Sequence, residues 1–172
     1  MSAASLIAVV IALACAAYAG PATAQTAKPH PQTAKPNSPS GTFVAVLEGG
    51  YAVPAVETSA GGTAELTWNG KALHYRLRVD GIDDITGAFV HIGRAGEEAP
   101  AVADLFDGFK PGPASGVLAE GTLSSARLHG TTQSRLLHAL REDNAYVTVH
   151  TRKHPSGEIR GQLRAQPTVA HR

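Results

Sequence analysis

The chain has 172 residues, of which 43% are hydrophobic and 17% charged, with 18 glycines and 11 prolines, as in one turn-rich globular domain. Its formal net charge of +1 comes from Lys28, Lys35 and Arg172, because residues 41–165 contain 12 basic and 14 acidic residues. Nucleic-acid binding requires a basic face with stacking aromatics, and the sequence has neither a basic surplus nor an aromatic cluster. We therefore predict no nucleic-acid partner.

The N-terminus begins with the apolar run SLIAVVIALACAAYA at residues 5–19. The run is short for a membrane span of about 20 residues, and small residues at Ala17, Ala19, Ala22 and Ala24 suit signal-peptide cleavage. Residues 1–24 are thus predicted to be a signal peptide, which implies a secreted or periplasmic protein with no membrane span after cleavage. The preceding MSAAS lacks Lys and Arg, so an uncleaved anchor stays open, as does lipidation at Cys15.

Residues 25–41 repeat QTAKP and are rich in Pro, Thr and Lys without aliphatic periodicity, which predicts a disordered linker. Residues 166–172 are predicted to form a disordered tail. The single cysteine, Cys15, lies in the leader. The exported body would therefore have no disulfide, no thiolate nucleophile and no cysteine metal ligand.

The folded part, predicted at 42–165, consists mainly of short alternating runs separated by Gly-bearing turns. About eight strands are expected, at 42–48, 63–68, 72–79, 87–92, 101–106, 116–123, 146–151 and 158–164. The Asn69-Gly70 pair predicts a tight hairpin turn. One short helix is expected over 132–142, capped by Thr131 or Thr132 and ended at Asp143-Asn144. This order of elements predicts an all-β class, with an antiparallel sandwich or barrel and one helix.

Histidines are the main chemical resource of this part of the chain. His91 and His150 end their strands, and alternation places both on the face opposite the aliphatic residues. If the two strands are neighbours, the rings converge, and His154 or His74 adds a third nitrogen for copper or zinc. The alternative is structural, since strand-end imidazoles commonly bond loop carbonyls. No catalytic residue is assigned.

The last strand carries Glu158, Arg160, Gln162 and Arg164 on its polar face, opposite Ile159 and Leu163. A charge-assisted pair between Glu158 or Arg160 and a loop is one alternative. Such a face is most often the solvated side of a strand, so we expect it to be wet and take Arg160 as structural.

The sequence resembles the CHRD (chordin) domain family over about residues 42–165. The strongest match is Tyr146-Val-Thr-Val-His-Thr151, Pro155 and Gly157-Glu-Ile-Arg-Gly-Gln-Leu163, in which Thr148 replaces the usual Asn. Tyr146, Gly157, Glu158, Arg160 and Gly161 belong to this signature. Supporting matches are Val53-Pro54 with Thr58 and Gly61-Gly62, Leu73 to Gly81, and His91-x-Gly93-x-x-Gly96. The family often has A-H-I-H where this chain has Phe89 in place of the first histidine.

The resemblance implies a compact antiparallel sandwich or barrel, similar in outline to the Greek-key fold of copper/zinc superoxide dismutase, in a secreted or envelope protein. The family has no generally assigned catalytic activity. We therefore expect a non-enzymatic binding or structural module with an envelope or extracellular protein partner, and no certain cofactor. The alternative is a copper-binding protein or a superoxide dismutase-like oxidoreductase that uses the strand-end histidines.

Overall fold

The computed structural model describes residues 40–167. The predicted signal peptide, nearly all of the predicted linker and residues 168–172 of the predicted tail lie outside this range. The elements, in chain order, are β1 (Gly41–Glu48), the 3-10 turn η1 (Gly49–Tyr51), β2 (Gly61–Trp68), β3 (Leu73–Ile92), β4 (Ala101–Thr122), the 3-10 turn η2 (Ser125–Arg127), α1 (Gln133–Arg141), β5 (Ala145–Thr151), β6 (Ile159–Gln162) and β7 (Arg164–Ala165).

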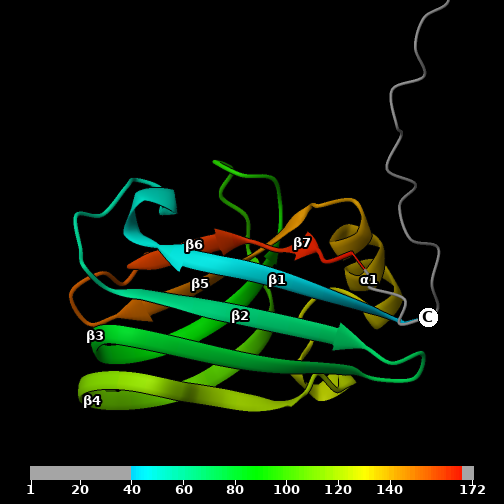
Figure 1. Ribbon diagram of the computed structural model, residues 1–172, viewed down its shortest axis with the longest axis horizontal. Helices are drawn as coiled ribbons and strands as arrows, with labels where there is room; N and C mark the ends of the chain where they lie inside the picture. Colours follow the sequence, from blue (N-terminus) through cyan, green and yellow to red (C-terminus); the bar gives the residue numbers. More distant parts are fainter. Residues whose placement is uncertain (1–39, 168–172) are drawn as a thin grey trace, which may run out of the picture. The chain divides into compact units, whose positions relative to one another are not determined.

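The strands form an antiparallel barrel (Figure 1). Along the sheet the order is β2, β1, β6, β5 and β3, and β3 pairs again with β2, so five strands close on themselves. β4 lies outside this ring on β3, and β7 pairs with the start of β1. The predicted all-β class with one short helix is therefore confirmed, and of the two architectures expected the structure is a barrel.

Two of the strands are much longer than the sequence pattern indicates. The runs expected at 72–79 and 87–92 are the two ends of β3, and those at 101–106 and 116–123 are the ends of β4. Register shifts interrupt the β3–β4 pairing, and Gly81 and Asp84 adopt positive φ angles of 60° and 49°. Such irregularities bend a strand without ending it. The first half of β3 can therefore pair with β2 and the second half with β5.

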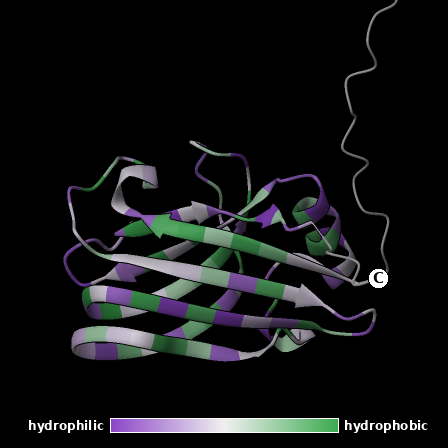
Figure 2. Ribbon diagram, viewed as in Figure 1, coloured by the Kyte–Doolittle hydropathy of each residue, from purple (hydrophilic) through white to green (hydrophobic). Residues whose placement is uncertain are grey.

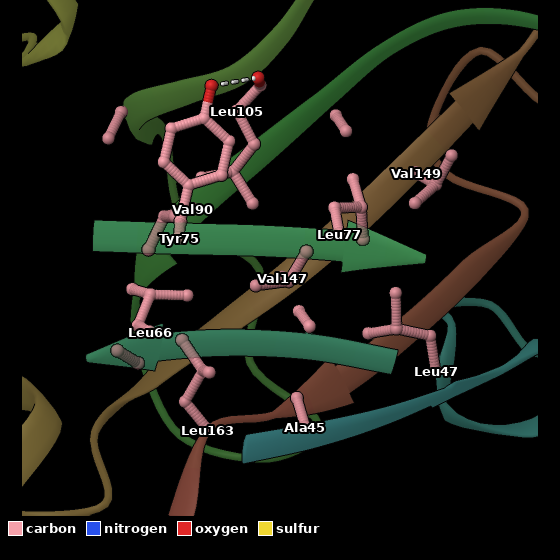
Figure 3. Close-up of a cluster of buried hydrophobic side chains, with 14 of the residues drawn as sticks. Ala45, Leu47, Leu66, Tyr75, Leu77, Val90, Leu105, Val147, Val149 and Leu163 are labelled. Atoms are coloured by element: carbon pink, nitrogen blue, oxygen red, sulfur yellow. Dashed lines mark hydrogen bonds between the residues drawn. The ribbon is translucent and has the colours of Figure 1, made fainter. Parts of the chain in front are cut away.

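The core fills the inside of the barrel. Hydrophobic and hydrophilic residues alternate along β3, as Figure 2 shows, and the predicted inward face of Leu73, Tyr75, Leu77 and Val79 is buried. Figure 3 shows side chains from the surrounding strands meeting in this core: Ala45, Leu47, Leu66, Leu77, Val90, Leu105, Val147, Val149 and Leu163. The one polar group drawn there is satisfied, since Tyr75 Oη donates to the Leu105 carbonyl at 2.9 Å.

The helix α1 follows the sequence prediction closely. The Thr132 side chain accepts a hydrogen bond from the Arg135 amide at 3.2 Å, which makes it the N-cap. Leu136, Leu137 and Leu140 are buried, and the chain leaves the helix through Asp143 at φ 52°. The helix thus packs its apolar face on the barrel and leads directly into β5.

The short strand β6 closes the barrel at a point of close backbone approach. It pairs with β5 along Ile159–Gln162 and with β1 through Glu48 and Arg160. A Cβ atom at Gly161 would overlap the carbonyl group of Val46 on β1. Only glycine therefore lets these two strands lie at this distance.

We expect Gly161→Ala to destabilise the protein, because the added methyl group must push β6 away from the β1 backbone. The free energy of unfolding should fall by about 3 kcal/mol, the upper end of the range typical of overpacking. Urea unfolding measures this change, with Gly50→Ala as the matched control, since a Cβ at Gly50 meets nothing within 4 Å. Equal stability of the two variants would show that β6 is free to shift.

Candidate functional site

Three neighbouring strands place polar side chains on the face of the sheet that points away from the core. His91 of β3 pairs with Tyr146 of β5, and Thr148 of β5 pairs with Arg160 of β6. Because alternate residues share a face, His150 lies on the same side as Tyr146 and Thr148. The two imidazoles therefore look away from the aliphatic core, as the alternation predicted.

Part of this polar face is buried, so the expectation of a wet face is wrong at Glu158 and Arg160, whereas Arg164 is exposed as expected. Glu158 and Arg160 keep only 8% and 4% of their surface exposed. The segment after β1 reaches over the face, where Thr58 Oγ1 donates to Glu158. The segment after β3 does the same, where the carbonyl of Arg94 accepts from Arg160. Strand alternation cannot reveal loops that cover a strand from outside the sheet.

The two histidines meet at one hydroxyl group. Nε2 of His91 and Nε2 of His150 each lie 2.9 Å from Thr148 Oγ1. At its other nitrogen, Nδ1, His91 donates to the carbonyl of Ala99 at 2.7 Å. The ring of Phe89 packs against His150 edge-on, with 5.0 Å between centroids. A continuous hydrogen-bonded chain therefore runs from the β3–β4 loop through both imidazoles.

Two aromatic rings and a guanidinium group, from His91, Tyr146 and Arg160, stack on one another across the same strands. Tyr146 lies parallel to His91 with 4.6 Å between ring centroids, and Cζ of Arg160 lies 3.6 Å from the centre of the Tyr146 ring. The Tyr146 hydroxyl accepts from the Ala99 amide at 2.9 Å, which anchors the outer end of the ring to the segment after β3. This stack fixes the guanidinium group by a cation–π contact.

Glu158 ties two loops together. Its carboxylate accepts from Thr58 Oγ1 at 2.8 Å and from Thr151 Oγ1 at 2.7 Å. Gly157, just before it, has φ 119°, which favours glycine, and passes beside the His150 ring. Gly157 and Glu158 therefore hold the β5–β6 turn against the rest of this face.

Between the loops and the strands lies a pocket of about 210 Å³. Its walls combine the hydrogen-bonded chain and the stack with parts of both loops: Ala52, Val53, His91, Glu98, Ala99, Tyr146, Thr148, His150, Ser156, Gly157 and Arg160. A larger hollow of about 450 Å³ lies over β2, β3 and β4. That second hollow is a solvated sheet surface, because its Arg76–Glu120 ion pair is more than half exposed at both ends.

Burial governs the ionisation of the groups in the pocket. It lowers the pKa of His91 below the usual 6.5; His150 and Arg160 act in the same direction, and the Ala99 carbonyl opposes them. Burial also lowers the pKa of His150, against the opposing effect of the Pro155 carbonyl. The pKa of Tyr146 is raised by burial. Both imidazoles and the phenol are therefore held toward their neutral forms.

The structure brings together two of the four histidines suggested as metal ligands. His91 and His150 share the pocket, whereas His74 lines the other hollow and bonds Asn69 and Thr122. His154 lies in the β5–β6 turn, and its side chain is not among the walls of the pocket. Within residues 40–167, no three His, Cys, Asp or Glu side chains are grouped closely enough to hold a metal ion.

Sequence reasoning assigned no role in the site to Thr148 and only a structural one to Arg160. Thr148 could have been found, because it lies between the histidines on the same face and replaces the family's usual Asn. Arg160 pairs with Thr148 across β5 and β6, but its burial depends on loops whose path the sequence pattern does not show.

Comparison with known proteins confirms the resemblance to the CHRD domain family. The model of the CHRD domain matches residues 43–163. A search of curated proteins finds Chordin of Xenopus laevis, 29% identical over 126 residues, which cover 68% of this chain and 12% of that protein. No solved structure gives a significant match. Within residues 40–167, no helix combines the length and apolar character needed to cross a membrane.

We expect acidification to destabilise the metal-free protein through the two buried imidazoles. Their folded-state pKa values lie below the unfolded value of 6.5, so the unfolded chain binds more protons as the pH falls. Their contribution is fully present above about pH 6.5 and is lost as the pH falls toward the folded-state pKa values. Urea unfolding at pH 7 and pH 5, with EDTA present, measures this loss.

The double variant His91→Gln/His150→Gln should lose less stability between these two pH values than the parent protein does. The control is His138→Gln, since His138 is exposed on α1 and lies outside the pocket. An identical loss in parent and double variant would show that other groups cause the effect.

Proposed function

Because the chain belongs to the CHRD domain family, we propose that it is an exported, non-enzymatic binding module of the cell envelope or extracellular space. Its partner would be an envelope or extracellular protein. The binding surface would be the outward face of β3, β5 and β6 that carries the pocket, together with the two covering loops. The chain spans only about 12% of Xenopus Chordin, so what the whole of that protein does is not carried over.

The observation that carries this proposal is a pocket whose walls are fixed before any ligand arrives. The stack of His91, Tyr146 and Arg160 holds the polar groups in place. Glu158 bonds the segment after β1 through Thr58 and the end of β5 through Thr151, and Arg160 bonds the segment after β3 through the Arg94 carbonyl. A preorganised pocket loses little conformational entropy on binding. Loops on a rigid β scaffold are also common binding elements.

Export is supported by the N-terminal sequence, which combines a short apolar run with small residues suited to cleavage.

We expect a photoreactive amino acid at Ser156 or Tyr51 to crosslink a partner in the native host, because both residues are exposed beside the pocket. The same probe at Lys71 is the matched control, since the β2–β3 turn lies at the opposite end of the barrel from η1 (Figure 1). Mass spectrometry of the crosslinked product identifies the partner. Equal crosslinking from Lys71, or none from all three positions, would contradict binding at the pocket.

Copper binding, with a superoxide dismutase-like activity as its extension, is a second candidate. The observation that favours it is the approach of two imidazole nitrogens to Thr148 Oγ1, each at 2.9 Å. Imidazole nitrogens suit copper, and each neutral ring has one nitrogen lone pair that a metal can bind in place of a hydrogen bond. The fit is partial, because two imidazoles and a hydroxyl offer fewer strong donors than a typical protein copper site has.

We expect Cu²⁺ titrated into the metal-free body to bind with lower affinity, by about tenfold or more, in His91→Ala and in His150→Ala. His74→Ala should bind copper as the parent does, because His74 lies in the other hollow. Calorimetry measures the affinities, and electron paramagnetic resonance reports the number of bound nitrogens. Unchanged affinity in both pocket variants would remove this candidate, and with it any dismutase activity.

A further inference from the structure

We propose that the pocket binds a single carboxylate group, presented by the partner as an acidic side chain or a chain terminus, with Arg160 as its anchoring cation. This inference rests on the proposed binding function and assigns a chemistry to the same site.

The main evidence is a buried guanidinium group that has no carboxylate partner. Arg160 is only 4% exposed, yet no carboxylate of residues 40–167 lies within ion-pair distance of it. Its hydrogen bond goes to the carbonyl of Arg94 at 3.0 Å. A buried cation without a counter-ion is costly, and proteins normally pair it.

The nearby carboxylate that could have neutralised Arg160 is engaged elsewhere. Glu158 lies two residues away on the same face, but its two oxygens accept from Thr58 and Thr151. The strand therefore holds an acid and a base close together without joining them. The Glu158 carboxylate stabilises the loops, and the guanidinium keeps donors for another acceptor.

Those donors reach the pocket. Arg160 is one of its walls. Among residues 40–167, the side-chain polar atoms that are sealed from solvent without a partner are Thr131 Oγ1, Asn144 Oδ1 and Gln162 Oε1, and none belongs to Arg160. The nitrogens that do not bond Arg94, Nε and Nη1, therefore keep a small accessible surface at the wall of the pocket, and their N–H groups can donate to a ligand there. The Tyr146 ring behind the guanidinium fixes the plane in which they point.

The size and charge of the pocket favour a carboxylate. Its volume of about 210 Å³ holds a carboxylate with a few waters, each of which occupies about 30 Å³ in the liquid. The planar fork of arginine matches the two oxygens of a carboxylate. Arg160 is the one permanently charged cation in the wall, and Glu98 adds a negative charge there. This balance suits a monoanion better than a phosphate dianion.

The test uses acetate as the probe at constant ionic strength, followed through the Arg160 Nε–Hε signal by NMR. We expect acetate to shift this signal saturably, phosphate to bind more weakly, and chloride to leave it unchanged. Binding followed through the backbone amide of Gly157 should weaken by about tenfold in Arg160→Gln, since one charge-assisted pair is removed. Arg160→Lys should weaken it less, because the charge remains and the fork is lost.

Two further variants keep the result interpretable if Arg160→Gln does not fold. Glu98→Gln should tighten acetate binding by about two- to fivefold, the effect of one partly exposed charge. Arg76→Gln is the matched control, since it removes an arginine from the solvated sheet surface, and it should change nothing. Acetate binding that is insensitive to both Arg160→Lys and Glu98→Gln would overturn the proposal, and tighter binding of phosphate than of acetate would overturn the choice of a carboxylate.

The crosslinking experiment separates the two proposals. A Ser156 crosslink that weakens in Arg160→Lys in parallel with acetate binding supports a carboxylate of the partner as the ligand. If the parent protein does not bind acetate and the crosslink persists unchanged in Arg160→Lys, the carboxylate site is overturned and the proposed binding module is left intact. Acetate binding at Arg160 without any crosslinked partner has the opposite meaning: the anion site exists, and the proposed function fails.

Discussion

The closure of the barrel through β6 is the constraint on which the rest of the structure depends. Four residues, Ile159–Gln162, join β1 to β5, and the missing side chain of Gly161 allows the approach to the β1 backbone. Ile159 points into the core, so Arg160 must point out of it. The strand β6, which closes the barrel, therefore also places the Arg160 guanidinium beneath the loops. Fold and site cannot be altered independently at this strand.

The polar groups buried on the outer face of the sheet constrain the loops that cover them. A buried hydroxyl, imidazole or carboxylate without a partner costs about 1–3 kcal/mol or more, so the covering segments must supply partners. They do so through Thr58, the main chain of Ala99 and the carbonyl of Arg94. The same bonds hold the loops down. The loops are thus ordered by the polar face that they cover, and removing one side of this arrangement would loosen the other.

The sequence allowed the parts of the structure that depend on local pattern to be predicted. Alternation located the strands and the outward direction of His91 and His150, and short-range polar chemistry located the Thr132 cap and the end of α1 at Asp143. Strand continuity was not predictable, because the bends in β3 look like turns in a linear pattern. The burial of Arg160 was also missed, since it depends on contacts between residues about 66 positions apart in the chain.

The single hydroxyl of Thr148 imposes a direction on the chain of imidazoles. Because the Ala99 carbonyl can only accept, the hydrogen of neutral His91 resides on Nδ1, and its Nε2 must accept from Thr148. Thr148 has then used its one hydrogen, so His150 has to donate from Nε2. A main-chain carbonyl thereby selects opposite tautomers in two identical side chains. Any ligand that needs both Nε2 lone pairs must first move the hydrogen of His150 to its other nitrogen.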